Sequence, residues 1–272
     1  MRRWTVVRTI GLATAAVIAV GVVYELPASP LSRHGDLGRQ IVPASVRTTA
    51  PSLESPAVAS RRTTNPVVPV KPAEVISYPS AGSQSYAVLP ADPAVIGRGG
   101  RLMTFQIAIE GGITGIDKTA FAQFVRTTYG AAQGWASQGK WRFQQVGPGA
   151  TPDFRLMLVT PRTRDLICGG GPDRYTSCRI GDSVVLNVAR WAHGVPNFGA
   201  SLTTYRQYMV NHETGHRLGN GHELCPGPGR PAPVMQQQTL GLHGCTAYAW
   251  PYLNGARYSG RLGQYNDPVP HS

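Results

Sequence analysis

Apolar side chains recur every three or four residues in the last third of the chain, and two histidines continue the same stripe. The periodic positions are Leu202, Tyr205, Met209, His212 and His216. This spacing places all five on one face of an α-helix. Ser201 is a good N-cap for such a helix because its hydroxyl can accept a hydrogen bond from the first turn. The pattern therefore predicts a helix that begins after Ser201 and carries two imidazoles on its buried face.

Upstream of this helix, the pattern predicts several strands and one other long helix. Partial alternation or compact apolar runs indicate strands, and an Asp N-cap followed by helical spacing indicates the helix. The predicted strands are 102–109, 141–146, 154–159 and 183–190, and the helix runs from Asp117 to about Gln138. Strands combined with two long helices predict an α+β domain.

The N-terminal part of the chain has a different character. A basic head precedes an apolar run from Ile10 to Tyr24, so residues 1–26 are predicted to be a signal peptide or a membrane anchor. Leu26 is a poor residue before cleavage at Ala28, which favours the anchor. Pro, Ser, Thr and Ala dominate residues 27–82, which predicts a disordered linker or, alternatively, a propeptide. Residues 83–272 are then long enough for one domain with one core.

The charge of the chain limits its partners only loosely. The formal net charge is +12, and basic residues also outnumber acidic ones within 83–272. Such a surface favours anionic groups of the cell envelope. No nucleic-acid recognition motif accompanies the charge, so a specific nucleic-acid partner is not expected. We expect a monomer.

The predicted helix ends in the most informative motif of the chain, H-E-x-x-H-x-x-G-x-x-H, from His212 to His222. His212 and His216 lie one turn apart and can bind one metal ion. Gly219 allows a left-handed turn that brings His222 back as a third ligand. Glu213 projects beside the metal, where it can take a proton from a water molecule. Three protein ligands leave a coordination position open, which is typical of catalytic Zn(II).

A glycine inside the predicted helix allows two interpretations. Gly215 costs about 1 kcal/mol relative to alanine in a helix interior. The helix either tolerates this cost, or another segment approaches so closely that no side chain fits. The sequence leaves both open.

Four cysteines allow three pairings, and sequential pairing is the simplest. It would join Cys168 to Cys178 and Cys225 to Cys245. An even number of cysteines is typical of an oxidising compartment, so we expect an extracytoplasmic protein, either anchored or secreted. A zinc site made of the four cysteines is the alternative, but their spacing does not match paired C-x-x-C motifs.

The long motif, followed by Met235 in a turn-rich segment, resembles the metzincin clan of zinc endopeptidases. In that clan a Met forms an apolar floor beneath the metal ligands, and Met235 is the matching residue. Residues 83–272 are also similar to a bacterial domain family of unknown function with a metzincin-like signature. Both resemblances imply a single zincin-like domain with a twisted mixed sheet, Zn(II), and a protein or peptide substrate.

The resemblance leaves two points open. Some metzincins place a Tyr two residues after the Met, whereas this chain has Gln237. A donor that stabilises the transition state would then come from elsewhere, with Tyr248, Tyr252 and His243 as candidates. The strand before the metal helix could be a sheet edge that pairs with a peptide. Hydrolysis of cell-wall amide bonds and a non-catalytic zinc-scaffold binding module are the alternative functions.

Overall fold

The longest strand, β3 (Arg101–Glu110), shows how the sequence builds the sheet. The chain is described by a computed structural model over residues 75–270, so the predicted membrane segment and most of the predicted linker lie outside the described residues. Side chains of β3 alternate between the two faces: Ile107 and Ile109 enter the main core, whereas Ala108 enters a smaller cluster on the opposite face. The two-residue period of a strand therefore supplies both faces with apolar surface.

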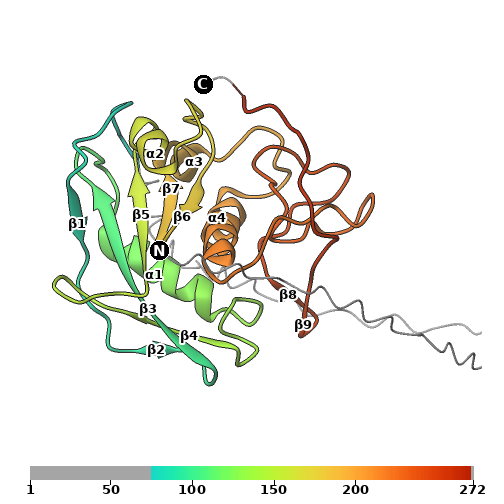
Figure 1. Cartoon of the computed structure of the whole chain (residues 1–272), viewed down its shortest axis with the longest axis horizontal. Helices are drawn as coiled ribbons and strands as arrows, with labels where there is room; N and C mark the ends of the chain where they lie inside the picture. Colours follow the sequence, from blue (N-terminus) through green and yellow to red (C-terminus); the bar gives the residue numbers. More distant parts are fainter. Residues whose placement is uncertain (1–74, 271–272) are drawn as a thin grey trace, which may run out of the picture. The chain divides into compact units, whose positions relative to one another are not determined.

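The sheet is mixed, with the strand order β2-β4-β3-β5-β7-β6 and with β1 pairing with β3 (Figure 1). Its four central strands, β4, β3, β5 and β7, are parallel to one another, and β1, β2 and β6 pair antiparallel to their neighbours. The remaining strands are β1 (Tyr86–Val88), β2 (Val95–Ile96), β4 (Trp141–Gln145), β5 (Phe154–Val159), β6 (Cys178–Ile180) and β7 (Ser183–Asn187). The predicted α+β class and mixed sheet are confirmed.

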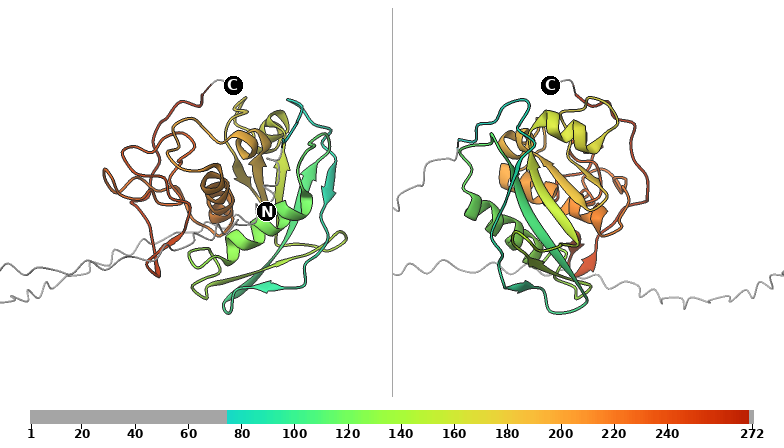
Figure 2. Two further views of the ribbon diagram at one scale, coloured as in Figure 1. Left: turned by 180° about the vertical axis from the view of Figure 1, so that it is seen from behind. Right: turned by 60° about the vertical axis from the view of Figure 1, so that its left-hand side comes forward.

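Helices cover both faces of this sheet. Helices α1 (Lys118–Gly130) and α4 (Leu202–Arg217) lie on one face of the sheet (Figure 2). Their apolar side chains belong to the main core. On the other face, Ile167 of α2 (Pro161–Cys168) packs against the smaller cluster. After α4, the chain runs mainly as loops on the side of α4 away from the sheet (Figure 1), interrupted only by the hairpin of β8 (Tyr252–Leu253) and β9 (Ala256–Arg257).

The long helix predicted from Asp117 begins as expected but ends early. The Asp117 side chain caps it, accepting a hydrogen bond from the backbone N–H of Ala120. The helix stops at Gly130 instead of Gln138. The following turns place Trp135 against α4, where its indole N–H donates to the backbone oxygen of Asn211 at 2.9 Å. This long-range contact replaces the last two predicted turns of helix.

The strand predicted at 183–190 is also shorter, and its place in the sheet differs from the expectation. It ends at Asn187, whose side chain caps the short helix α3 (Val188–His193) by accepting from Ala189 N. This strand, β7, lies between β5 and β6 and is therefore not an edge. The edge next to β7 is β6, a strand that the sequence pattern did not predict.

Residues 75–82, which the sequence assigned to the end of the linker, have an ordered structure. Ile76 is buried in the main core, and Ser77 forms a backbone bridge with Thr114. Residues 75–82 therefore pack with the domain. Within the described range, no helix has the length and apolar character needed to cross a bilayer.

Candidate metal centre

Helix α4 supplies two of the three histidines, and its local sequence explains its position. Ser201 caps it as predicted, accepting a hydrogen bond from Thr204 N at 3.1 Å. Tyr205, Met209 and His212 are buried, whereas Leu202, predicted at the start of the same stripe, is 38% exposed. The helix is fixed deep in the core, so the histidines at its C-terminal end stand on a rigid base.

A turn after α4 brings the third histidine to the other two. The helix ends at Arg217, and Gly219 adopts a φ of +91°. That conformation strains residues with a side chain, so the predicted role of Gly219 agrees with its backbone. Three residues later, His222 faces the end of the helix.

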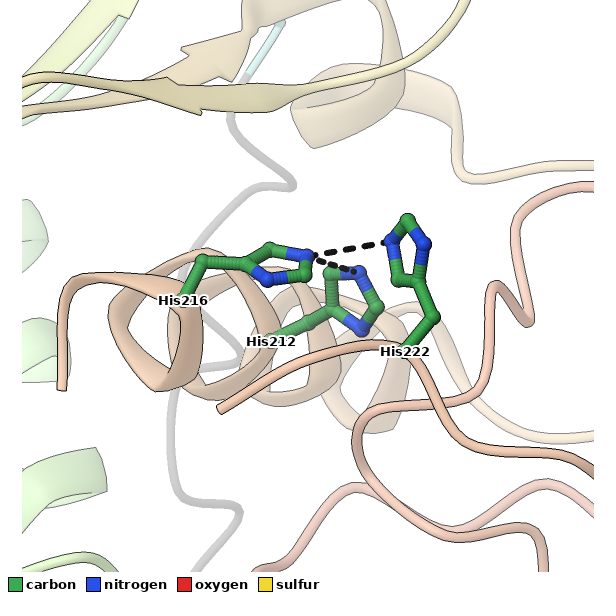
Figure 3. Close-up of side chains that lie close together, drawn as sticks. All are labelled: His212, His216 and His222. Atoms are coloured by element: carbon green, nitrogen blue, oxygen red, sulfur yellow. Dashed lines mark hydrogen bonds between the residues drawn. The ribbon is translucent and has the colours of Figure 1, made fainter. Parts of the chain in front are cut away.

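The three imidazoles converge on one point (Figure 3). Nε2 of His216 lies 3.2 Å from Nε2 of His212 and 3.1 Å from Nε2 of His222. A tetrahedral zinc with Zn–N bonds of about 2.0–2.1 Å requires N···N separations of about 3.3 Å. These two separations therefore suit a single metal ion, and the three histidines are the one group of His, Cys, Asp or Glu among the described residues that could hold one.

The opposite nitrogen of each ring explains why these atoms face one another. Nδ1 of His212 donates to the backbone oxygen of Val234 at 2.8 Å, and Nδ1 of His216 donates to that of Asn220 at 2.9 Å. Nδ1 of His222 donates to Oε1 of Gln264, also at 2.9 Å. Each Nδ1 therefore carries the ring hydrogen, and three Nε2 lone pairs converge. Such an arrangement repels itself unless a cation lies between the rings.

Burial keeps two of these rings neutral. Burial lowers the pKa of His212 well below its ordinary value, and the neighbouring histidines lower it further. For His216, burial first and His222 second lower the pKa to about 4. Neutral imidazoles are the form that binds metal ions, so these two ligands need lose no proton at neutral pH.

Glu213 lies beside the histidines, in the wall of the same cavity of about 490 Å³. Its side chain is almost fully buried, and burial raises its pKa to about 8, against the opposing charges of Arg164 and Arg179. Within the described part of the chain, its Oε2 atom has no hydrogen-bond partner. A buried carboxylate without a hydrogen-bond partner is costly to maintain, and this cost is the reason that burial raises the pKa.

Met235 packs against α4 at Gly215 and explains why this position is a glycine. Met235 is fully buried in a turn closed by a hydrogen bond from Gln236 N to Pro233 O. A Cβ atom added at Gly215 would lie 2.4 Å from the Met235 sulfur and 2.9 Å from the ring of Trp135. Gly215 is therefore required for close approach, which decides between the two interpretations left open by the sequence.

Both predicted disulfides are present. Cys168 pairs with Cys178, and Cys225 pairs with Cys245, which leaves no free cysteine. The four-cysteine zinc site is thereby excluded. The second disulfide closes a loop that contains Met235, so it constrains the floor of the metal centre. The first joins α2 to β6, the edge strand that lines the cavity. Two disulfides are typical of an oxidising, extracytoplasmic location.

The three candidate donors lie away from the cavity. The Tyr248 hydroxyl donates to the backbone oxygen of Tyr252, and His243 pairs with Asp267 at 2.8 Å. None of Tyr248, Tyr252 and His243 lines the cavity, whereas Gln237 does.

Three further residues at the centre were missed in the sequence. Arg164 and Arg179 line the cavity, and Gln264 binds His222. Gln264 lies 42 residues from His222, and no spacing rule marks any of the three. Only the folded structure brings these three residues close to the histidines.

Comparison with known proteins identifies a family but no function. Residues 73–255 match the family described as "Protein of unknown function (DUF3152)". No curated protein and no solved structure matches the chain. The matched range contains all three histidines, Glu213, Met235 and both disulfides. The chain therefore belongs to the DUF3152 family, and within it this structure places a three-histidine site suited to a metal ion.

Proposed function

We propose that the protein is an extracytoplasmic zinc-dependent endopeptidase. The observation that carries this proposal is the pairing of two features in one open cavity. Three imidazole nitrogens converge on a point, and a buried carboxylate with an unpaired oxygen adjoins them. A purely structural zinc site is usually closed by a fourth protein ligand. Among the described residues, no fourth His, Cys, Asp or Glu joins this cluster.

The roles of the residues follow from their positions. His212, His216 and His222 would hold Zn(II), which polarises a substrate carbonyl and acidifies water when bound. Glu213 would take the proton of the attacking water on its carboxylate and then deliver it to the leaving amine. Burial holds the pKa of Glu213 at about 8 despite the opposing charges of Arg164 and Arg179, so most of this group is protonated at pH 7 in the metal-free protein. The positive charge of bound Zn(II) would lower this pKa and favour the carboxylate form needed to accept that proton.

Gln237 is our candidate for the donor that stabilises the transition state. It occupies the position two residues after Met235, where the sequence lacks a Tyr, and it lines the cavity. No hydrogen bond of its side-chain amide is found within residues 75–270, so the N–H groups are available to substrate. One donor of this kind contributes about a hundredfold or more to turnover in other hydrolases.

An extended peptide is the substrate that the surroundings favour. Strand β6 is the last strand of the sheet, and Cys178 and Arg179 of this strand line the cavity. An edge strand can pair its backbone with an extended peptide. Such pairing would lay a peptide along β6 and across the histidines. This arrangement supports a protein substrate over a small molecule.

The test compares Glu213→Gln with the wild-type protein. We expect the variant to keep its fold and its zinc, and to lose at least about a hundredfold in chelator-sensitive cleavage of casein. Asp92→Asn, which changes a carboxylate outside the cavity, is the control and should keep full activity. Full activity of Glu213→Gln would remove this residue from the chemistry. Activity on purified peptidoglycan but not on casein would instead establish a cell-wall amidase.

A further inference from the structure

We infer that the C-terminal segment 261–267, here called the strap, holds the third histidine of the candidate metal centre in place. Within the strap, Gln264 is a positioning residue that orients the His222 ring. The inference rests on metal binding by the three histidines and not on the reaction proposed above. It concerns residues beyond the matched range of the family, which ends at residue 255.

The three ligands are not held equally. His212 and His216 stand on α4, and their Nδ1 atoms donate to backbone oxygens of Val234 and Asn220. His222 stands in a loop, and its Nδ1 donates to the side chain of Gln264. His222, the histidine that is not on a helix, is therefore the one whose ring is oriented by a side chain instead of by the backbone. That contact fixes which ring nitrogen carries the hydrogen and which one faces the metal.

Backbone pairing holds the strap against the loop of His222, at the ligand itself and at the two residues that follow it. Gly263 N donates to the backbone oxygen of His222 at 3.0 Å, and Leu224 N donates to that of Arg261 at 2.8 Å. Between these bonds, Glu223 and Leu262 form an antiparallel bridge. The strap and the ligand loop thus form a short two-stranded ladder, which restricts where His222 can move.

The far end of the strap is anchored to another part of the site. The Tyr265 ring stacks on the His243 ring with centroids 3.4 Å apart, and the carboxylate of Asp267 pairs with the same histidine at 2.8 Å. His243 lies within the loop closed by Cys225 and Cys245. The Tyr265 hydroxyl also accepts from Cys225 N at 3.2 Å. The strap therefore links the third ligand to the loop that carries the methionine floor.

The strap also leads into the cavity. Val269, two residues beyond Asp267, lines the same cavity as the three histidines. His243 thus acts as an anchor for the strap, which is the role the structure gives it in place of the predicted transition-state donor.

The test measures zinc affinity, so it does not depend on hydrolysis. Purified full-length wild type and Gln264→Ala are titrated with zinc in competition with a chromophoric chelator. We expect Gln264→Ala to weaken zinc binding about tenfold, at the lower end of the usual 10–100-fold effect of such partners, because Gln264 is exposed. Gln264→Glu should restore binding, since a carboxylate accepts the Nδ1 hydrogen equally well.

Gln138→Ala is the matched control, with the same substitution outside the strap. Its side chain is exposed and does not line the cavity, so zinc affinity should stay at the wild-type value. Equal affinities for wild type and Gln264→Ala would overturn the role of Gln264, while leaving the proposed peptidase intact. A wild type that binds zinc tightly but cleaves nothing would overturn the peptidase and leave the strap. A wild type without zinc affinity would overturn both.

Discussion

At the residue scale, the candidate metal site depends on two glycines for different reasons. Gly219 supplies a backbone conformation, with a φ of +91°, whereas Gly215 supplies space for Met235. The sequence motif predicted the first role because the glycine has a fixed offset from the histidines. It could not predict the second, because the neighbour that needs the space lies 20 residues further along the chain and meets the helix only in the folded protein.

Gly215→Ala tests this packing. An added Cβ would lie 2.4 Å from the Met235 sulfur, so the methionine floor must shift. Overpacking of this kind costs about 1–3 kcal/mol, which exceeds the gain of about 1 kcal/mol in helix propensity. We expect a lower Tm by thermal unfolding of the disulfide-intact protein. Gly99→Ala, where the added atom meets nothing closer than 3.5 Å, is the control, and an equal Tm for both variants would contradict the account.

At the scale of elements, the sequence predicted features that depend on a few neighbouring residues. It did not predict features that depend on contacts between distant residues. Ser201 and Asp117 cap their helices as predicted, because a cap acts within three residues. The early end of α1 depends on the contact of Trp135 with Asn211, 76 residues away. The position of β7 inside the sheet depends on β6, whose three residues carry too short a pattern to recognise. Sheet order could not be read from the sequence.

The two disulfides are predicted to differ in what they support. Replacing either pair by serine should cost about 3 kcal/mol. The sequence separations are 10 and 20 residues, and a doubling of loop length changes the loop-closure entropy by only about 0.6 kcal/mol. Only loss of Cys225–Cys245 should weaken zinc binding as well, since that loop carries Met235 and anchors the strap through His243. Thermal unfolding and zinc titration of the two double-serine variants measure the two effects separately. Equal zinc affinities in the two variants would contradict this division.

At the scale of the whole molecule, burial of the histidines couples metal binding to stability. The pKa of His216 is lowered to about 4 in the folded, metal-free protein, from an ordinary value near 6.5. The unfolded chain therefore binds protons in this range that the folded chain does not. Stability attributed to this group is complete above about pH 6.5 and is lost as the pH falls toward 4.

We therefore expect the Tm of the chelator-treated protein to fall as the pH is lowered from 7 to 4. Zinc should raise the Tm at pH 7, because it binds the folded state alone, and this increase should shrink on acidification, as protons compete for the same nitrogens. Scanning calorimetry with and without zinc across this range checks both effects. His216→Ala should show a weaker dependence of the metal-free Tm on pH, and an unchanged dependence would contradict the assignment.

The central claim is that three imidazole nitrogens bind one zinc ion. X-ray absorption spectroscopy of the full-length protein, loaded with one equivalent of zinc, tests it most directly. The account predicts a first shell of nitrogen and oxygen at about 2.0–2.1 Å, with multiple scattering from three imidazoles and no sulfur. Sulfur at about 2.3 Å, fewer than three imidazoles, or no stoichiometric binding would contradict it.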